Sequence, residues 1–252
     1  MKRLIVLLLV MTALSMSATA HAADSVLIVV TSHAQMGDMN KRTGFWLAEL
    51  THPYYVIKDA GYNVVVASID GGVAPIDPRS MDTTDAVNRR FLGDAELMAA
   101  VLNSRKLADI DPNNFAAVLF SGGHGTMWDF PGDSSVNRVA STVYEDGGVV
   151  GAVCHGPAAL TEVKLSDGSY LIDGKRFAAF TNEEEKMVEL DTVVPFLLQD
   201  RLTERGGIHV PSPAWQTNAV IDQRVVTGQN PQSAHRVGEL IVEALRSKSE
   251  SK

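Results

Sequence analysis

The chain has 252 residues, with 22 Lys and Arg residues against 30 Asp and Glu residues. Its fractions of hydrophobic (45%) and charged (21%) residues are typical of a globular protein and exclude the disordered and low-complexity classes. The acidic balance argues against nucleic acid and anionic membrane surfaces as partners, since both need clustered Lys and Arg. The single cysteine excludes an intrachain disulfide and a cysteine-rich metal site.

The first 22 residues have the three-part pattern of a secretory signal peptide. Lys2 and Arg3 precede an apolar run over residues 4–14, which is too short to span a bilayer, and Ala20-His21-Ala22 forms a cleavage triplet. The alternative is an uncleaved membrane anchor. We predict cleavage before Ala23 and export to a bacterial periplasm or secretion.

After residue 22, apolar segments typical of buried strands alternate with segments of helical periodicity. In chain order, we expect a strand at 25–31, a helix at 43–60, a strand at 63–68, a polar loop or lid at 70–90 and a helix at 96–104. There follow a strand at 115–121, a helix at 136–146, strands at 149–153 and 177–180, a helix bent at Pro195 over 188–204, a hairpin at 219–227 and a helix at 234–246. This alternation predicts one α/β domain over residues 23–252, a mostly parallel sheet with helices on both faces.

Cys154 stands at the end of a predicted buried strand, and a helix is expected to begin directly after it. The segment Ala152–Gly156 has the small-x-nucleophile-x-Gly form of a nucleophile elbow, whose tight turn needs small flanking residues. A helix N-terminus favours the thiolate, so we expect the pKa of Cys154 to lie well below that of a free thiol. The alternative is a buried structural cysteine.

The glycine-rich turn over residues 121–129 follows another predicted strand end. Consecutive glycines let the backbone approach a reacting group, and their N–H groups can stabilise an oxyanion. Gly123, His124 and Trp128 are therefore candidate substrate-binding residues of a small pocket. Glycine-rich turns also occur in ordinary loops, so the turn alone is a weak signal.

Two acidic segments are further candidates. Glu49 lies among largely apolar residues of the first predicted helix, where a carboxyl held protonated can shuttle a proton. The alternative for Glu49 is an ordinary solvated glutamate. In the charged run at 182–186, one acid could orient an imidazole as the third member of a triad does, and the residues alone do not choose among Glu183, Glu184 and Glu185.

Together these motifs resemble the ThiJ/PfpI superfamily, and within it the branch of glutathione-independent glyoxalases (glyoxalase III) and heat-inducible chaperones. The matching segments cover most of the chain after residue 25; they are the stretch from Arg42 to Tyr55, SGGHGTMWDFP, VCHGPAAL, FTNEEE and VTGQNPQSAH. The resemblance implies a class I glutamine amidotransferase-like, flavodoxin-like sandwich with a cysteine nucleophile elbow, and a homodimer.

The resemblance also implies roles for four residues. Cys154 matches the nucleophile, His155 the histidine that follows it, Glu49 the acid that hydrogen-bonds the cysteine, and Glu185 the acid near the histidine. The implied reaction converts methylglyoxal, a small 2-oxoaldehyde, and water to D-lactate through a Cys154 hemithioacetal, without a cofactor. We identify no His/Glu set matching the zinc site of one relative, so we expect no metal.

Two other function classes stay open. One is a cysteine hydrolase or amidase, such as a peptidase or protein deglycase. The other is a holdase chaperone or a redox sensor, in which a low-pKa thiol is oxidised to sulfinic acid.

Overall fold

The structure is a computed structural model, which describes residues 25–250; the predicted signal peptide and its cleavage site lie outside this range. Nine strands are assigned within it: β1 Ser25–Val30, β2 Asn63–Ser68, β3 Arg105–Lys106, β4 Ala117–Phe120, β5 Val149–Val153, β6 Arg176–Phe177, β7 Ile208–His209, β8 Ala219–Asp222 and β9 Val225–Gly228. The helices of the same range are α1 Leu47–Asp59, α2 Ala86–Leu92, α3 Ala95–Leu102, α4 Thr126–Asp129, α5 Ser134–Glu145, α6 Asn182–Met187, α7 Leu198–Glu204 and α8 Ala234–Glu250.

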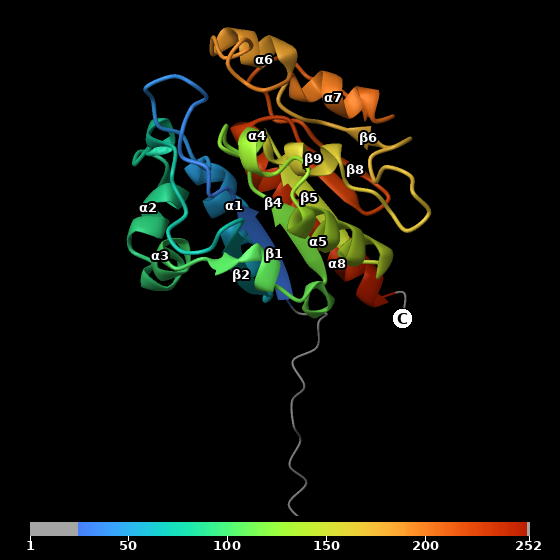
Figure 1. The fold of residues 1–252 in the computed structure, drawn as a ribbon. Helices are drawn as coiled ribbons and strands as arrows, with labels where there is room; N and C mark the ends of the chain where they lie inside the picture. Colours follow the sequence, from blue (N-terminus) through green and yellow to red (C-terminus); the bar gives the residue numbers. More distant parts are fainter. Residues whose placement is uncertain (1–24, 251–252) are drawn as a thin grey trace, which may run out of the picture.

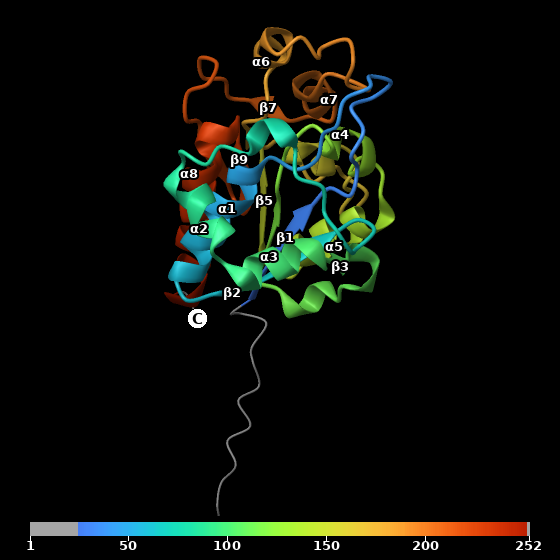
Figure 2. The same ribbon diagram turned by 90° about the vertical axis from the view of Figure 1, so that its left-hand side faces the viewer.

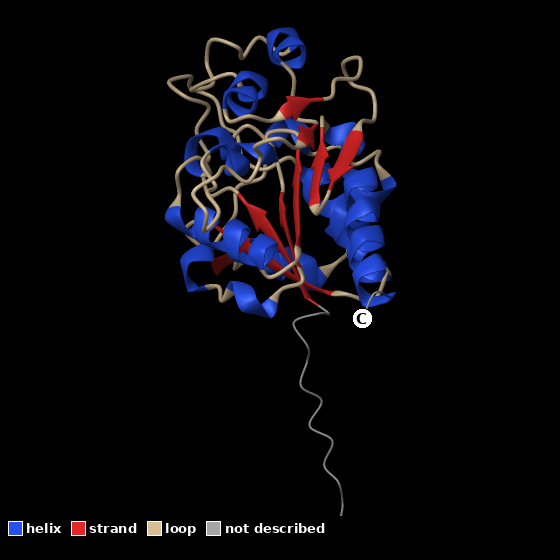
Figure 3. Ribbon diagram, turned by 90° about the vertical axis from the view of Figure 1, so that its right-hand side faces the viewer, coloured by secondary structure: helices blue, strands red, loops and turns tan. Residues whose placement is uncertain are grey.

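A seven-stranded sheet in the order β3-β2-β1-β4-β5-β9-β8 forms the centre of the molecule. Its neighbouring strands run parallel except for the β8–β9 hairpin. Figure 3 shows these strands passing between helices on both sides, so the predicted α/β class is confirmed.

Side chains of the central strands alternate between two cores because successive residues of a strand point to opposite faces. Val26, Ile28 and Val30 of β1 pack into the core beneath α1 and α8. Leu27 and Val29 pack into the other core, beneath α5. Burial on both faces explains why the strand is apolar without alternation.

The carboxyl ends of the parallel strands lie on one side of the molecule, and α6 and α7 lie above them (Figure 1). Figure 2 shows α1, α2, α3 and α8 on a neighbouring side, with α6 and α7 again at the top. In open α/β sheets ligands bind at the carboxyl ends of the strands. Within residues 25–250, no helix is both long and apolar enough to cross a bilayer.

Three predicted elements differ from the structure. The helix expected at 43–60 begins only at Leu47, because Phe45 instead bridges to Ile76. The expected strand at 177–180 is reduced to β6, which pairs with β7 outside the main sheet. The segment expected to form a loop at 70–90 also contains a 3₁₀ helix, η2 Pro78–Ser80, and the start of α2.

The helix expected over 188–204 is confirmed only in its second half. The charged run at 182–186 forms α6, and a separate helix, α7, begins at Leu198. Glu189 has a left-handed φ of 59°, and Pro195 disfavours helical conformation at the residue before it. Between them the chain contributes Val194 to the core as an irregular segment.

Candidate active site

Cys154 occupies the turn between β5 and a six-residue 3₁₀ helix, η5 Gly156–Thr161. Its φ of 60° lies in the left-handed region, which costs a residue with a side chain on the order of 1–2 kcal/mol. Gly156 lets the turn close: a Cβ there would come within 2.1 Å of the carbonyl oxygen of Phe120. The strained, small-residue turn is the elbow that the sequence predicts.

Glu49 extends from the first turn of α1 toward this elbow and is fully buried. Its carboxyl lies so close to Gly122 that a Cβ there would be 2.3 Å from Oε2. Neither carboxyl oxygen has a well-formed hydrogen bond among the described residues. Burial raises the pKa of Glu49 well above its ordinary value, although contacts with the Cys154 thiol and the Gly122 backbone partly oppose this. Glu49 is therefore protonated beside the thiol.

The low thiol pKa predicted from the sequence is wrong. Burial raises the pKa of Cys154 above that of a free thiol, and the neighbouring Glu49 carboxyl raises it further. A backbone contact from His155 lowers it only in part, and η5 is too short to supply a strong helix dipole. The resting thiol is thus neutral and 4% exposed, so it needs a base.

His155 is positioned to act as that base. Its Nδ1 lies 3.3 Å from Sγ of Cys154, and its Nε2 lies 2.8 Å from Oε2 of Glu185. A carboxylate can only accept hydrogen bonds, so Nε2 of His155 carries the proton and Nδ1 presents a lone pair to the thiol. Glu185 comes from the first turn of α6, which begins at Thr181 with a capping box.

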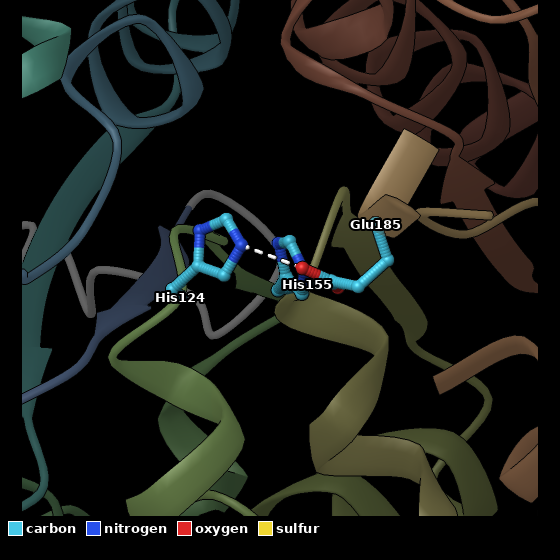
Figure 4. A group of neighbouring side chains, drawn as sticks. All are labelled: His124, His155 and Glu185. Carbon is cyan, nitrogen blue, oxygen red and sulfur yellow. Dashed lines mark hydrogen bonds and ion pairs between the residues drawn. The ribbon is translucent and has the colours of Figure 1, made fainter. Parts of the chain in front are cut away.

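The same carboxylate also holds a second histidine. His124 Nε2 lies 2.9 Å from Oε1 of Glu185, and the rings of His124 and His155 are 4.0 Å apart. Figure 4 shows both imidazoles directed at one carboxylate. Despite its burial, Glu185 has a pKa below the ordinary range because both histidines stabilise the charged form. Burial and the neighbouring His155 lower the pKa of His124 to about 4.

These three side chains also have metal-compatible spacing. Ligand atoms of His124, His155 and Glu185 lie within 4.8 Å of one another, a set that we did not recognise from the sequence. Each Nε2 is within hydrogen-bonding distance of its own carboxylate oxygen. We therefore interpret the group as one acid orienting two imidazoles.

A cavity of about 290 Å³ opens above the elbow. Its lining includes Gly123, His124, Cys154 and His155, which the sequence predicts, and Arg79, which it does not. The structure thus brings most of the predicted site residues together at one cavity.

Arg79 is the main residue that sequence reasoning missed. Its Nε and Nη2 bind the buried carboxylate of Asp77 at 3.0 and 2.7 Å, and Nη2 lies 3.2 Å from Nδ1 of His124. Thr43 donates a further hydrogen bond to Asp77. The remaining nitrogen, Nη1, takes no part in these hydrogen bonds, and the residue lines the cavity. The Asp77-Pro78-Arg79 turn gives no sequence signal of this role beyond its place in the predicted lid.

The other predicted residues differ in whether they reach the site. Trp128 does not line the cavity; its ring stacks on His33 at 5.2 Å. Glu183 is exposed on α6, and Glu184 is fully buried but points away from the histidines to another loop. Among the three adjacent glutamates, Glu185 is the one that orients His155.

A parallel α/β sheet with a strained cysteine elbow, flanked by a histidine and two buried acids, defines a class of the flavodoxin-like fold with a cysteine at its strand-to-helix turn. The DJ-1/PfpI family model matches residues 41–244, and the chain belongs to this family.

Two named proteins are similar to the chain over most of its length. Glyoxalase 3 of Candida albicans is 32% identical over 87% of this chain and 97% of its own. Glutathione-independent glyoxalase HSP31 of Saccharomyces cerevisiae is 29% identical over 89% and 99%.

Two solved structures are also similar to the chain over most of its length. The Rapid Encystment Protein 24 kDa of Francisella tularensis is 44% identical, with a TM-score of 0.86 over 88% of this chain and 99% of that one. Glyoxalase III of Candida albicans is 30% identical, with a TM-score of 0.83 over 89% and 98%.

Proposed function

We propose that this protein is a glutathione-independent glyoxalase, which converts methylglyoxal and water to D-lactate and protects against reactive carbonyl compounds. The observation that carries the proposal is the protonated, buried Glu49 beside a thiol that already has a histidine base. A second proton carrier is what an isomerisation between two adjacent carbons requires. The similarity to named glyoxalases points the same way.

In the first step, His155 Nδ1 takes the thiol proton and Sγ of Cys154 adds to the aldehyde carbon. Glu49 gives its proton to the aldehyde oxygen, so the product is a neutral hemithioacetal and Glu49 becomes a carboxylate. Glu185 stabilises the imidazolium, as the acid of a catalytic triad does. Backbone N–H groups near Gly123 and His155 stabilise the developing oxyanion.

In the second step, the Glu49 carboxylate removes the proton on the aldehyde carbon while imidazolium His155 protonates the ketone oxygen. This gives an enediol. Glu49 then returns its proton to the former ketone carbon, and His155 removes the proton from the hydroxyl on the sulfur-bearing carbon. The result is a Cys154 thioester of lactic acid: one carbon has been oxidised and its neighbour reduced.

In the third step, water attacks the thioester, Glu49 takes a proton from the water, and the departing sulfur recovers the proton from His155. Lactic acid leaves and loses its proton to solvent to give lactate, and all three groups regain their starting protonation states. Oxidation and reduction occur within one substrate, so the balance needs no redox partner.

Arg79 has a supporting role in this scheme. Its guanidinium is fixed by Asp77, and the free Nη1 edge is suited to hydrogen-bond the ketone oxygen as negative charge develops there. We expect Arg79→Gln to lower kcat by about 10²-fold, the usual cost of removing one such donor. An unchanged kcat in a steady-state lactate assay would remove Arg79 from the scheme.

The geometry also bears on the other function classes. A cysteine with a histidine and an orienting acid is sufficient for amide hydrolysis, whereas proton transfer between two adjacent carbons additionally needs a second proton carrier such as the buried, protonated Glu49. A redox sensor needs a reactive thiolate, whereas the pKa of Cys154 is raised. Both observations favour the glyoxalase.

The direct test is a lactate assay of purified protein with methylglyoxal in the absence of glutathione. An enzymatic assay with D-lactate dehydrogenase measures the D isomer, and chiral chromatography of the product checks the stereochemistry. Absence of lactate together with hydrolysis of an amide substrate would instead establish the hydrolase.

We also propose that the mature enzyme is an exported homodimer. The support for export is the sequence of residues 1–22, and the support for a dimer is the family resemblance. N-terminal sequencing of the periplasmic fraction tests the first, and retention of Met1 would contradict it. Light scattering tests the second, and a monomeric mass would contradict it.

A further inference from the structure

Trp215 has an unusual backbone conformation at the mouth of the cavity. Its φ is 62°, which a bulky residue rarely adopts. Its side chain lines the cavity and remains 37% exposed, so burial in the core does not compensate for this strain. A strained backbone of this kind persists only where its surroundings hold it, and such residues cluster at functional sites.

The surroundings that hold Trp215 centre on the fully buried Glu184. Oε1 of Glu184 accepts hydrogen bonds from the backbone N–H of Trp215 at 2.9 Å and from the side chains of Gln229 and Asn230 at 3.2 and 2.8 Å. Its Oε2 accepts two more from Thr181. The buried side chain of Glu184 therefore holds the loop that carries Trp215.

The ring of Trp215 continues an aromatic wall that reaches the reacting groups. It packs edge-on against Phe180 at 5.7 Å, and Phe180 packs against His155 at 4.3 Å. Adjacent glutamates of α6 therefore have separate tasks: Glu185 fixes the imidazoles, and Glu184 fixes the outer end of this wall.

The cavity has two chemically different walls. The segment from Arg79 to Asn88 contributes polar side chains, whereas Phe180, Val188 and Trp215 contribute an apolar surface. The volume of about 290 Å³ is close to the lower limit for sites that hold drug-sized ligands, about 300 Å³, and far exceeds the needs of a three-carbon aldehyde.

We infer that Trp215 is a specificity-determining residue, which binds the substituent R of a 2-oxoaldehyde R–CO–CHO and favours aromatic or bulky apolar R. The inference rests on the proposed glyoxalase function. The two carbonyl oxygens face the polar wall and Arg79, and R lies along Phe180 and Trp215. Aromatic rings gain from edge-on and offset contacts beyond simple burial.

The test compares kcat/KM for phenylglyoxal and methylglyoxal, from initial rates, in the wild type and in Trp215→Ala. We expect wild type to prefer phenylglyoxal, and Trp215→Ala to lose about tenfold with phenylglyoxal while changing little with methylglyoxal. Trp215→Phe should keep the preference. Ile221→Ala, which alters a similarly exposed apolar residue on β8, is the matched control and should change neither rate.

Trp215→Gly tests whether the strained Trp215 serves substrate specificity or the stability of the fold. Glycine adopts positive φ without steric cost, so the thermal unfolding midpoint should stay the same or rise while the phenylglyoxal preference falls. A marked fall in the midpoint would assign Trp215 a structural role and overturn the inference.

Two further outcomes distinguish the inference from the proposed function. If the wild type forms lactate but Trp215→Ala keeps the ratio of the two kcat/KM values, the specificity role fails and the glyoxalase stands. If the wild type converts neither aldehyde, the glyoxalase fails, and calorimetric binding of mandelate against lactate decides the inference. Tighter mandelate binding that Trp215→Ala removes would support it, and equal binding would overturn it.

Discussion

Glu49 and Glu185 are both buried glutamates that serve the same thiol, yet their environments are opposite. Glu49 enters from α1, has no well-formed hydrogen bond, and is kept protonated by burial. Glu185 enters from α6, accepts hydrogen bonds from two histidines, and stays ionised. Burial opposes ionisation in both cases, so the partners decide the outcome.

The comparison teaches how two carboxyl groups acquire different chemistry. A protonated acid can donate and later accept a proton, whereas a permanently ionised one can only orient an imidazole and stabilise its charge. The predictions that follow concern loss of the thiol, substitution of each acid in turn, and the effect of Glu49 on the pKa of Cys154.

Removing the thiol should have the largest effect on activity. We expect Cys154→Ala to reduce lactate formation to background, because no hemithioacetal can form. The thermal unfolding midpoint should change little, since little volume is lost. A lactate assay measures the activity, and a thermal melt measures the unfolding midpoint. Turnover near that of wild type would reject covalent catalysis.

Neutralising the orienting acid should have the next largest effect. In Glu185→Gln one of the two imidazole N–H groups faces an amide NH₂, so His155 loses its fixed tautomer and its counter-charge. We expect kcat to fall by about 10⁴-fold, as for the orienting acid of a serine protease. Glu183→Gln, on the exposed neighbour, is the control and should keep full activity.

The acid limb of stability gives a second readout for Glu185. Its pKa is lowered by folding, so it stabilises the folded state above pH 4.5, and that contribution is lost as the pH falls. The unfolding free energy of Glu185→Gln should therefore depend less on pH below 4.5 than that of wild type. Parallel acid limbs in urea titrations would contradict the assigned ionisation.

Glu49→Gln tests the proton-carrying acid. The amide retains the size of the carboxyl but cannot take and return a proton, so we expect kcat to fall on the order of 10²–10⁴-fold. Glu96→Gln, on the first turn of α3, is the control. Turnover within a few-fold of wild type would leave His155 as the sole proton carrier.

The stability of Glu49→Gln should depend on pH in the opposite sense to that of Glu185→Gln. Glu49 is protonated in the fold but ionises above pH 4.5 in the unfolded chain, so it costs stability as the pH rises. Relative to wild type, the Glu49→Gln variant should become more stable between pH 5 and pH 8. Urea unfolding at the two pH values measures this, and a constant difference would show that Glu49 is ionised.

The smallest expected effect concerns the coupling of Glu49 to the thiol. Burial and Glu49 both raise the pKa of Cys154, so the pH midpoint of iodoacetamide alkylation should lie above that of a free thiol. Glu49→Gln removes the carboxyl group that raises the thiol pKa and should lower this midpoint. A midpoint that does not move would mean that Glu49 does not act on Cys154 electrostatically.

The reactive centre could be predicted from sequence because local patterns encode it. The small residues around Cys154 report a tight turn, and the order of strands and helices reports the sheet edge on which it lies. The direction of its pKa could not be predicted in this way, because it depends on burial and on Glu49, which is over a hundred residues away in the chain.

The cavity walls were harder to predict for the same reason. Arg79 lies in the single-turn helix η2 and Trp215 in an irregular segment, and neither has a periodic pattern. The buried carboxylate of Asp77 holds Arg79, and the buried Glu184 holds Trp215 from a distant part of the chain. The false first half of the helix predicted over 188–204 arose because apolar residues of an irregular, core-forming segment have helical spacing. Glu189, with its positive φ, carries no sequence signal that would have ended the helix.

The neutral state of Cys154 has a consequence for the lifetime of the enzyme. Thiolates, not thiols, attack peroxides and disulfides, so a buried thiol with a raised pKa reacts poorly with both until its proton moves to His155. Under the export that we propose, a neutral thiol of this kind would stay reduced where free thiols are lost. Because Glu49 raises the pKa of Cys154, peroxide inactivation should be faster in Glu49→Gln than in wild type, and equal rates would show that Glu49 does not contribute to this protection.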